Sequence, residues 1–310
     1  LRRVFPDERR GTVMPQTITT GFKKLVETAM SQNQWSDIQY GQIPSRAGMI
    51  YRDAFKRHDA DRYDQFIGSV LKGEAKINAG TLYPYELMQK VKNGNDNTVE
   101  ALWRNLPNYA DTDENAIVVA DVSGSMYGLP MDVCISLAMY IAERNKGLFK
   151  DKFITFSAQP EIQEIKGETL YEKYTNLSRA DWDMNTNLNK AFEKILDTAV
   201  KGSVPQEEMP AMVLILSDMQ FDQCVKHDDS AIEMIARKYE AAGYTLPKVV
   251  FWNLNASYGN APVKFDKSGT ALVSGFSPAV VKPLLAGEIE TFTPESVMLK
   301  TIMDDRYKVL

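Results

Sequence analysis

The chain is poor in the residues that most enzymes use for acid–base and nucleophilic chemistry. Among its 310 residues are two histidines, His58 and His227, and two cysteines, Cys134 and Cys224. Two cysteines allow at most one disulfide, and both lie in stretches that read as regular elements, so we expect buried free thiols and a cytoplasmic, reducing environment. A zinc site or a Ser-His-Asp triad would need ligands or histidines that the chain lacks at any recognised spacing. These scarcities argue against the common catalytic chemistries, and we expect both histidines to be structural.

Long apolar runs are missing as well. No stretch approaches the roughly 20 apolar residues that cross a bilayer, and the N-terminal residues lack the apolar core of a secretory signal. We therefore expect no contact with a membrane. Because the chain starts at Leu1 rather than Met, we also expect that a segment upstream was removed, and a signal could have gone with it.

What the chain does contain is typical of a folded protein of about two domains. Hydrophobic residues make up 44% and charged residues 25%, whereas 18 Gly and 14 Pro are too few for a linker-dominated chain. The charge is unevenly divided. Residues 1–110 hold 16 basic and 12 acidic residues, a net +4, and residues 111–310 hold 20 basic and 29 acidic residues, a net −9. This division suggests an anionic partner for the N-terminal part.

The hydrophobic pattern changes near Asn115. Before it, apolar residues at helical spacing predict helices at 46–57, capped by Ser45, and at 63–71, capped by Asp59, with further helices at 85–91 and 98–106. After it, apolar runs predict strands at 116–120, 153–156, 212–217, 249–254 and 271–273, which alternate with helices at 131–144, 188–200, 231–242 and 278–285. Buried strands that alternate with helices predict an α/β fold, a mostly parallel, Rossmann-like sheet with helices on both faces.

Oxygen-bearing side chains gather where three of these segments meet one edge of the predicted sheet. The first strand is followed by Asp121, Ser123 and Ser125 at alternate positions, and the third strand, at 212–217, is followed by Asp218. Thr186 precedes the helix at 188–200, which lies between these two strands in the sequence. Ligands collect beyond the carboxyl ends of parallel strands, so we expect these five side chains to converge. Hard divalent cations such as Mg²⁺, Mn²⁺ or Ca²⁺ prefer oxygen donors of this kind. Alternatively, Ser123 and Ser125 merely cap the following helix and Asp218 is a solvated loop residue.

This constellation resembles the metal-ion-dependent adhesion site of von Willebrand factor A domains, which consists of an Asp-x-Ser-x-Ser loop, a distant Thr and a distant Asp. By position, Asp121, Ser123 and Ser125 correspond to the first-loop ligands, Thr186 to the second and Asp218 to the third. One departure is that Met184-Asn185 stands where many such domains have a Gly pair. The resemblance implies the von Willebrand factor A fold and a bound Mg²⁺, or Mn²⁺ or Ca²⁺ in its place.

Further segments extend the resemblance over nearly the whole chain. Gln34-Trp35, Pro44-Ser45-Arg46-Ala47, Ser217-Asp218-Met219-Gln220-Phe221-Asp222 and Phe251-Trp252-Asn253 are similar to a little-characterised family that is distantly similar to the TROVE module of Ro ribonucleoproteins. This implies an α-helical segment at 1–113 that ends a longer helical-repeat module, a von Willebrand factor A domain at 114–290, and a C-terminal helix at 291–310 that packs back on it.

These observations predict a binding protein and not an enzyme, with no organic cofactor. The first hypothesis is a metal-dependent module that captures an acidic group of a protein partner. The second is a Ro-like RNA-binding protein, in which Arg46, Arg52, Lys56 and Arg57 contact phosphates; a solvated helix face is the plainer interpretation of these four residues. A metal-assisted phosphohydrolase is the enzymatic alternative, but it needs a base or second metal that the sequence does not provide. The sequence does not indicate the oligomeric state.

Overall fold

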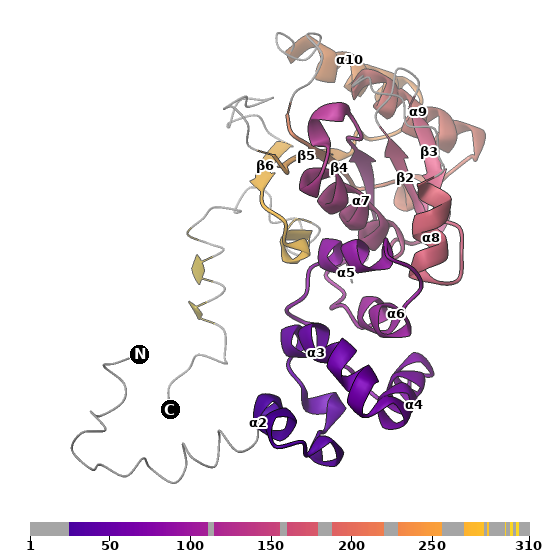
Figure 1. Cartoon of the computed structure of the whole chain (residues 1–310). Coiled ribbons are helices and arrows are strands. Elements are labelled where there is room, and N and C mark those ends of the chain that lie inside the picture. The colour runs from indigo at the N-terminus through magenta and orange to yellow at the C-terminus, as the bar shows by residue number, and fades with distance from the viewer. Residues whose placement is uncertain are drawn as a thin grey trace, which may run out of the picture. The chain divides into compact units, whose positions relative to one another are not determined.

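The computed structural model (Figure 1) describes residues 25–110, 115–155, 160–178, 188–219, 229–255 and 270–281, together with single positions at 284, 295, 298, 299, 302 and 303. The described residues fall into two compact units. The first takes its residues from Leu1–Leu82 and Asn97–Asn105, and the second from Tyr83–Asp96 and Leu106–Leu310. None of the described helices is both long and apolar enough to cross a membrane. The predicted helix at 291–310 lies mostly outside the described residues, so its packing stays a prediction.

The first unit is built from helices throughout its described part. Its elements are α2 (Val26–Ser31), η2 (Trp35–Asp37), η3 (Tyr40–Gln42), α3 (Ser45–His58), α4 (Ala60–Leu71) and α6 (Asn97–Arg104). The apolar stripes of α3 and α4 meet in a core that includes Phe55, Tyr63 and Ile67, which are at most 2% exposed. The helices predicted from apolar spacing at 46–57, 63–71 and 98–106 are therefore confirmed.

Asp59 is the N-cap residue of α4, but its side chain does not make the predicted capping hydrogen bond. Its carboxylate instead accepts hydrogen bonds from the Tyr40 hydroxyl at 2.7 Å and from Arg62 Nε at 2.8 Å. Arg62 also donates to the carbonyl oxygens of Trp35 and Ile38. A charge-assisted bond to arginine is stronger than a bond to a neutral amide, so the carboxylate is drawn away from the helix end. It thereby links η2 and η3 to α4.

The second unit contains a six-stranded sheet in the order β3-β2-β1-β4-β5-β6. Its strands are β1 (Ala116–Ala120), β2 (Lys152–Thr155), β3 (Glu161–Glu164), β4 (Met212–Ser217), β5 (Lys248–Asn253) and β6 (Thr270–Ser274). All neighbouring strands pair in parallel except β2 and β3, which are antiparallel. This is the order of a doubly wound sheet. Its topological switch point, where the strand order reverses, lies between β1 and β4.

Both faces of the sheet are covered. Alternate residues of a strand point to opposite faces, and the odd-numbered residues of β1, β4 and β5 share one core with α9 (Leu188–Lys201) and α10 (Asp229–Ala241). Helix α7 (Leu129–Ala142) packs on β1 and β2 and lies in front of the sheet in Figure 1. Every residue of β1 and β4 is buried. Burial on both faces explains why these strands are continuous apolar runs, and the predicted α/β fold is confirmed.

Helix α5 (Pro84–Val91) comes from the part of the sequence that was predicted to be a helical segment, yet it packs on α7 of the sheet unit. Leu87 on α5 is fully buried. At the polar edge of the contact Lys92 forms an ion pair with Asp132, and Gln89 Nε2 donates to the same carboxylate at 3.3 Å. The polypeptide thus contributes to the sheet unit before the first strand begins.

Candidate metal centre

The first loop of the candidate site follows β1 directly. The Asp121 amide donates to the Leu216 carbonyl at 2.9 Å, which extends the pairing of β1 with β4 to the aspartate itself. The Asp121 carboxylate accepts a hydrogen bond from the Ser123 amide at 2.9 Å, and this turn brings the hydroxyls of Ser123 and Ser125 to within 3.1 Å of each other. The three predicted first-loop ligands therefore lie together. Asp121 is fully buried, whereas Ser125 is exposed, so the loop leads from the interior to solvent.

Asp218, the other predicted ligand that the structure describes, lies directly after the neighbouring strand. Asp218 follows β4, which pairs in parallel with β1, and it is 4% exposed. Burial raises the pKa of Asp121, hydrogen bonds from Ser217 and Ser123 lower it, and the negative charge of Asp218 raises it further. The two buried carboxylates repel each other, and a cation bound between them would offset this repulsion.

Ser217 connects the two loops through its hydroxyl, and it was not among the predicted ligands. Its hydroxyl donates to Asp121 Oδ2 at 2.6 Å and accepts a hydrogen bond from the Met219 amide at 3.1 Å. Met219 has a φ of 65°, a left-handed conformation that is uncommon for a side chain of its size. Ser217 is the last residue of β4 and is fully buried. Its position directly before Asp218 is the feature of the sequence from which its role could have been predicted.

The donor set fits a hard divalent cation. Carboxylates from Asp121 and Asp218 and hydroxyls from Ser123 and Ser125 are the oxygen ligands that Mg²⁺ prefers. Within the part of the chain that the structure describes, no three His, Cys, Asp or Glu side chains gather at a metal-sized site. A cation held here would therefore depend on hydroxyl oxygens as well as carboxylates. The predicted fifth ligand, Thr186, lies outside the described residues.

Cys134 lies on α7 behind the first loop, where its thiol contacts the Leu216 carbonyl at 3.6 Å. It is a buried free cysteine, as predicted, and burial together with the charge of Asp121 raises the pKa of its thiol. Cys224 and His227 lie outside the described residues. His58 stacks on Trp35 with ring centroids 4.5 Å apart, which agrees with a structural role.

The four basic residues predicted to contact RNA all lie on α3. Arg46 and Arg57 are exposed, whereas the Arg52 side chain is 16% exposed and pairs with Asp53 at 3.0 Å. Arg46, Arg52 and Lys56 all have interaction partners within the protein. The RNA contacts therefore stay a prediction.

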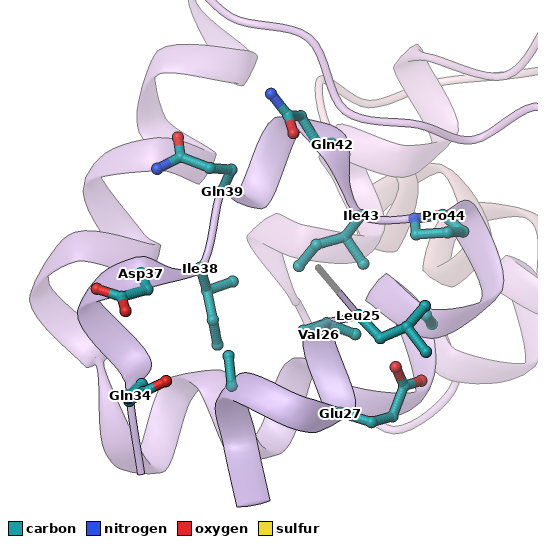
Figure 2. Close-up of a pocket in the computed structure, with 12 residues that line it drawn as sticks. Leu25, Val26, Glu27, Gln34, Asp37, Ile38, Gln39, Gln42, Ile43 and Pro44 are labelled. Atoms are coloured by element: carbon teal, nitrogen blue, oxygen red, sulfur yellow. The ribbon is translucent and has the colours of Figure 1, made fainter. Parts of the chain in front are cut away.

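The helical unit also contains a cavity of about 590 Å³, which Figure 2 shows. Aliphatic side chains such as Ile38 and Ile43 line it, and its polar lining comes from Glu27, Asp37 and three glutamines. No lysine or arginine is among the twelve residues that line this cavity. Its chemistry therefore does not suit a phosphate group.

Comparison with known proteins adds relatives but no activity. The chain is 31% identical over 299 residues to "Uncharacterized protein L728" of Acanthamoeba polyphaga mimivirus, with 90% of this chain and 52% of that protein covered, so it spans about half the length of this relative. Among solved structures, that of the Deinococcus radiodurans RO (RSR) protein matches with a TM-score of 0.43 and 16% identity, over 67% of this chain and 45% of that one.

Two family descriptions match successive parts of the sequence. Residues 18–121 match "Domain of unknown function (DUF2828)", and residues 115–307 match "Domain of unknown function (DUF7788)". Because the second match covers more than half of the chain, the chain belongs to the DUF7788 family.

Proposed function

We propose that this chain is a binding protein that captures an acidic group of a protein partner through a divalent cation. Asp121, Ser123, Ser125 and Asp218 would hold the cation, with Thr186 as a further ligand. The observation that carries the proposal is the pair of buried carboxylates at the carboxyl ends of β1 and β4, joined through Ser217. The strand order and the Asp-x-Ser-x-Ser loop support identification of the sheet unit as a von Willebrand factor A domain.

The protein side of the site favours binding over catalysis. Two carboxylates balance the charge of a divalent ion, so a partner's carboxylate can approach without strong repulsion. A bound Mg²⁺, Mn²⁺ or Ca²⁺ would supply the coordination position for that carboxylate. Residues 121–129, 216–219 and 253–255, at the ends of three strands, include no His, Lys, Arg or Glu that would act as a general base or nucleophile there.

A thermal-unfolding experiment tests this proposal. Addition of Mg²⁺ or Mn²⁺ at a hundred times its dissociation constant stabilises the folded state by about 2.7 kcal/mol, which we expect to raise the melting temperature by roughly 5–10 °C. The variant Asp121→Asn keeps the shape of the side chain and removes its charge, so it should fold without metal and show no shift.

The matched control is Asp197→Asn, which removes an exposed carboxylate on α9. This control should respond to metal as the parent does. Equal shifts in the parent and in Asp121→Asn would refute the assignment of the site.

RNA binding by the helical unit is the second candidate, and the charge division favours it. The net charge of +4 over residues 1–110 contrasts with −9 over the remainder, and Arg46 and Arg57 are exposed on α3. The resemblance of the sequence to Ro-like proteins supports the same candidate. In this case the sheet unit would bind its partner independently of the RNA.

A further inference from the structure

Two exposed apolar side chains lie shortly after the predicted cation ligands of the first loop. Tyr127 is 90% exposed and Leu129 is 41% exposed, two and four residues after Ser125. Single exposed apolar residues are common on protein surfaces and need no explanation by themselves. Here the position beside a candidate ligand-binding loop, and the way in which the backbone holds the tyrosine, make the pair informative.

The backbone on both sides of Tyr127 is fixed. Met126, which precedes it, is fully buried and donates its amide to Ser123 at 3.1 Å. The Tyr127 amide donates to the Gly124 carbonyl at 3.2 Å. Gly128, with a φ of 91°, then turns the chain into α7. The ring is thus presented to solvent by a hydrogen-bonded turn, and an aromatic side chain that is held in this way loses little entropy when it contacts a partner.

A second strand end supports the same loop. Asn255 follows β5, and its side-chain Nδ2 donates to the Ser125 carbonyl at 3.4 Å. The backbone amide of Asn255 donates to Asn253 Oδ1 at 2.9 Å. The surface next to the predicted cation ligands therefore combines the Asn255 amide, the Tyr127 ring and the Leu129 side chain, on backbone that is held by hydrogen bonds.

We propose that Tyr127 and Leu129 form the specificity-determining rim of the site and contact a large apolar side chain next to the captured carboxylate. This inference rests on the proposed function and narrows its partner to a peptide segment in which Glu or Asp adjoins a residue such as Leu, Met or Phe. The carboxylate binds at the cation, and the neighbouring side chain covers the ring of Tyr127.

A nucleobase could also stack on an exposed tyrosine, with its phosphate at the cation. The charges of the site favour the peptide. Residues 121–129, 216–219 and 253–255 contain no Lys or Arg, the residues that neutralise the phosphate charges of a bound nucleic acid. Residues 111–310, which include these segments, carry a net charge of −9, which repels a polyanion further.

The test is a displayed library of seven-residue peptides with a fixed central Glu and randomised flanks, selected on the full chain in Mg²⁺. We expect the selected peptides to be enriched in Leu, Met and Phe beside the Glu. The best of them should bind Tyr127→Ala about tenfold more weakly than the parent. Tyr127→Phe, which keeps the ring, should bind as the parent does. Selection of apolar flanks that is equally strong on Tyr127→Ala would overturn the inference.

Two further readouts keep the inference distinguishable from the function on which it rests. Tyr127→Ala should bind Mg²⁺ with the same affinity as the parent. If the parent itself does not bind Mg²⁺, the proposed function is refuted. If the parent binds Mg²⁺ but selects no apolar flanks, the inference alone fails. If a single-stranded oligonucleotide binds the parent in Mg²⁺ and binds Tyr127→Ala much more weakly, the ligand of this rim is a nucleic acid and not a peptide. That result would contradict the inference.

Discussion

At the scale of the residue, the Ser217 side chain links the two carboxylate loops. Its hydroxyl binds Asp121 and the Met219 amide at the same time. The variant Ser217→Ala removes the hydroxyl, so a buried oxygen of the Asp121 carboxylate loses this donor. Loss of a hydrogen bond that supports a metal ligand commonly lowers metal affinity 10- to 100-fold. We expect Ser217→Ala to bind Mn²⁺ at least about tenfold more weakly, measured by calorimetric titration.

Ser217→Thr supplies the comparison for this measurement. Threonine keeps the hydroxyl, so it should retain most of the affinity that alanine loses. Parent-like Mn²⁺ binding in Ser217→Ala would show that the hydrogen bond has no part in holding the site.

Tyr239 is expected to make the stability of the sheet unit sensitive to alkaline pH. Its hydroxyl donates to the Phe192 carbonyl at 3.0 Å in the core, and burial raises the pKa of Tyr239 above its ordinary value of 10.0. As pH rises beyond that value, the unfolded chain loses a proton that the folded chain retains. The free energy of unfolding should therefore fall with increasing pH, by up to about 1.4 kcal/mol per pH unit for this one group.

Urea unfolding of the parent and of Tyr239→Phe between pH 9 and pH 11 checks this expectation. The variant lacks the ionisable group, so its stability should fall less steeply with pH. Identical slopes for the two proteins would contradict the assignment of this effect to Tyr239.

Position in the sequence predicts some residues of the candidate site and not others. Asp121, Ser123, Ser125 and Asp218 were predicted because a side chain that directly follows a buried parallel strand lies at the ligand-binding edge, whatever the details of the fold. The contact between Ser217 and Asp121 depends on the register of β1 against β4, which pairs Ala120 with Leu216 and which no local pattern specifies.

At the scale of the element, α5 is expected to stabilise the sheet unit. Leu87 is fully buried on α5, which packs on α7. Leu87→Ala removes buried methyl groups and leaves a cavity, so it should lower the free energy of unfolding by about 2–5 kcal/mol. Hydrogen exchange should show the loss of protection in α7 and β1.

Ile50→Ala is the matched control, because Ile50 is 69% exposed on α3. It should change stability by less than about 0.5 kcal/mol. If Leu87→Ala reduced protection in α3 and α4 but left α7 and β1 unchanged, α5 would not belong to the sheet unit.

Elements were predicted where the apolar pattern is strong and missed where it is weak. The strand β3 (Glu161–Glu164) begins and ends with exposed charges and pairs at the sheet edge, as edge strands often do, so no alternation or apolar run marked it. Helix α8 (Leu170–Leu177) was also missed, although Thr169 and Glu172 form a capping box that announces it. Ser45 was predicted as a cap, but it is the first residue of α3, and Pro44 holds the N-cap position.

At the scale of the whole molecule, the opposite net charges of residues 1–110 and 111–310 predict how RNA would bind. Each phosphate contact on a single strand adds about −0.7 to the slope of log affinity against log salt, so three or four contacts give roughly −2 to −3. We expect weak binding of single-stranded RNA at low salt with such a slope, measured by fluorescence anisotropy. The double variant Arg46→Glu/Arg57→Glu, which reverses two exposed charges on α3, should make the slope less steep.

Lys201→Glu, at the exposed end of α9, reverses a charge on the sheet unit and should leave the slope unchanged. If RNA does not bind even at low salt, the Ro-like candidate fails for this chain. An acidic peptide that still binds in Mg²⁺ would then leave the protein-binding function in place.

We expect one divalent cation to be held between the loops that follow β1 and β4. A titration with Mn²⁺, followed by electron paramagnetic resonance of the free ion, counts such sites directly. We predict one tight site per chain in the parent and in Asp197→Asn, and none in Asp121→Asn, because the last variant removes one of the two buried carboxylates. An Asp121→Asn protein that remains folded and still binds one Mn²⁺ with the affinity of the parent would contradict the claim.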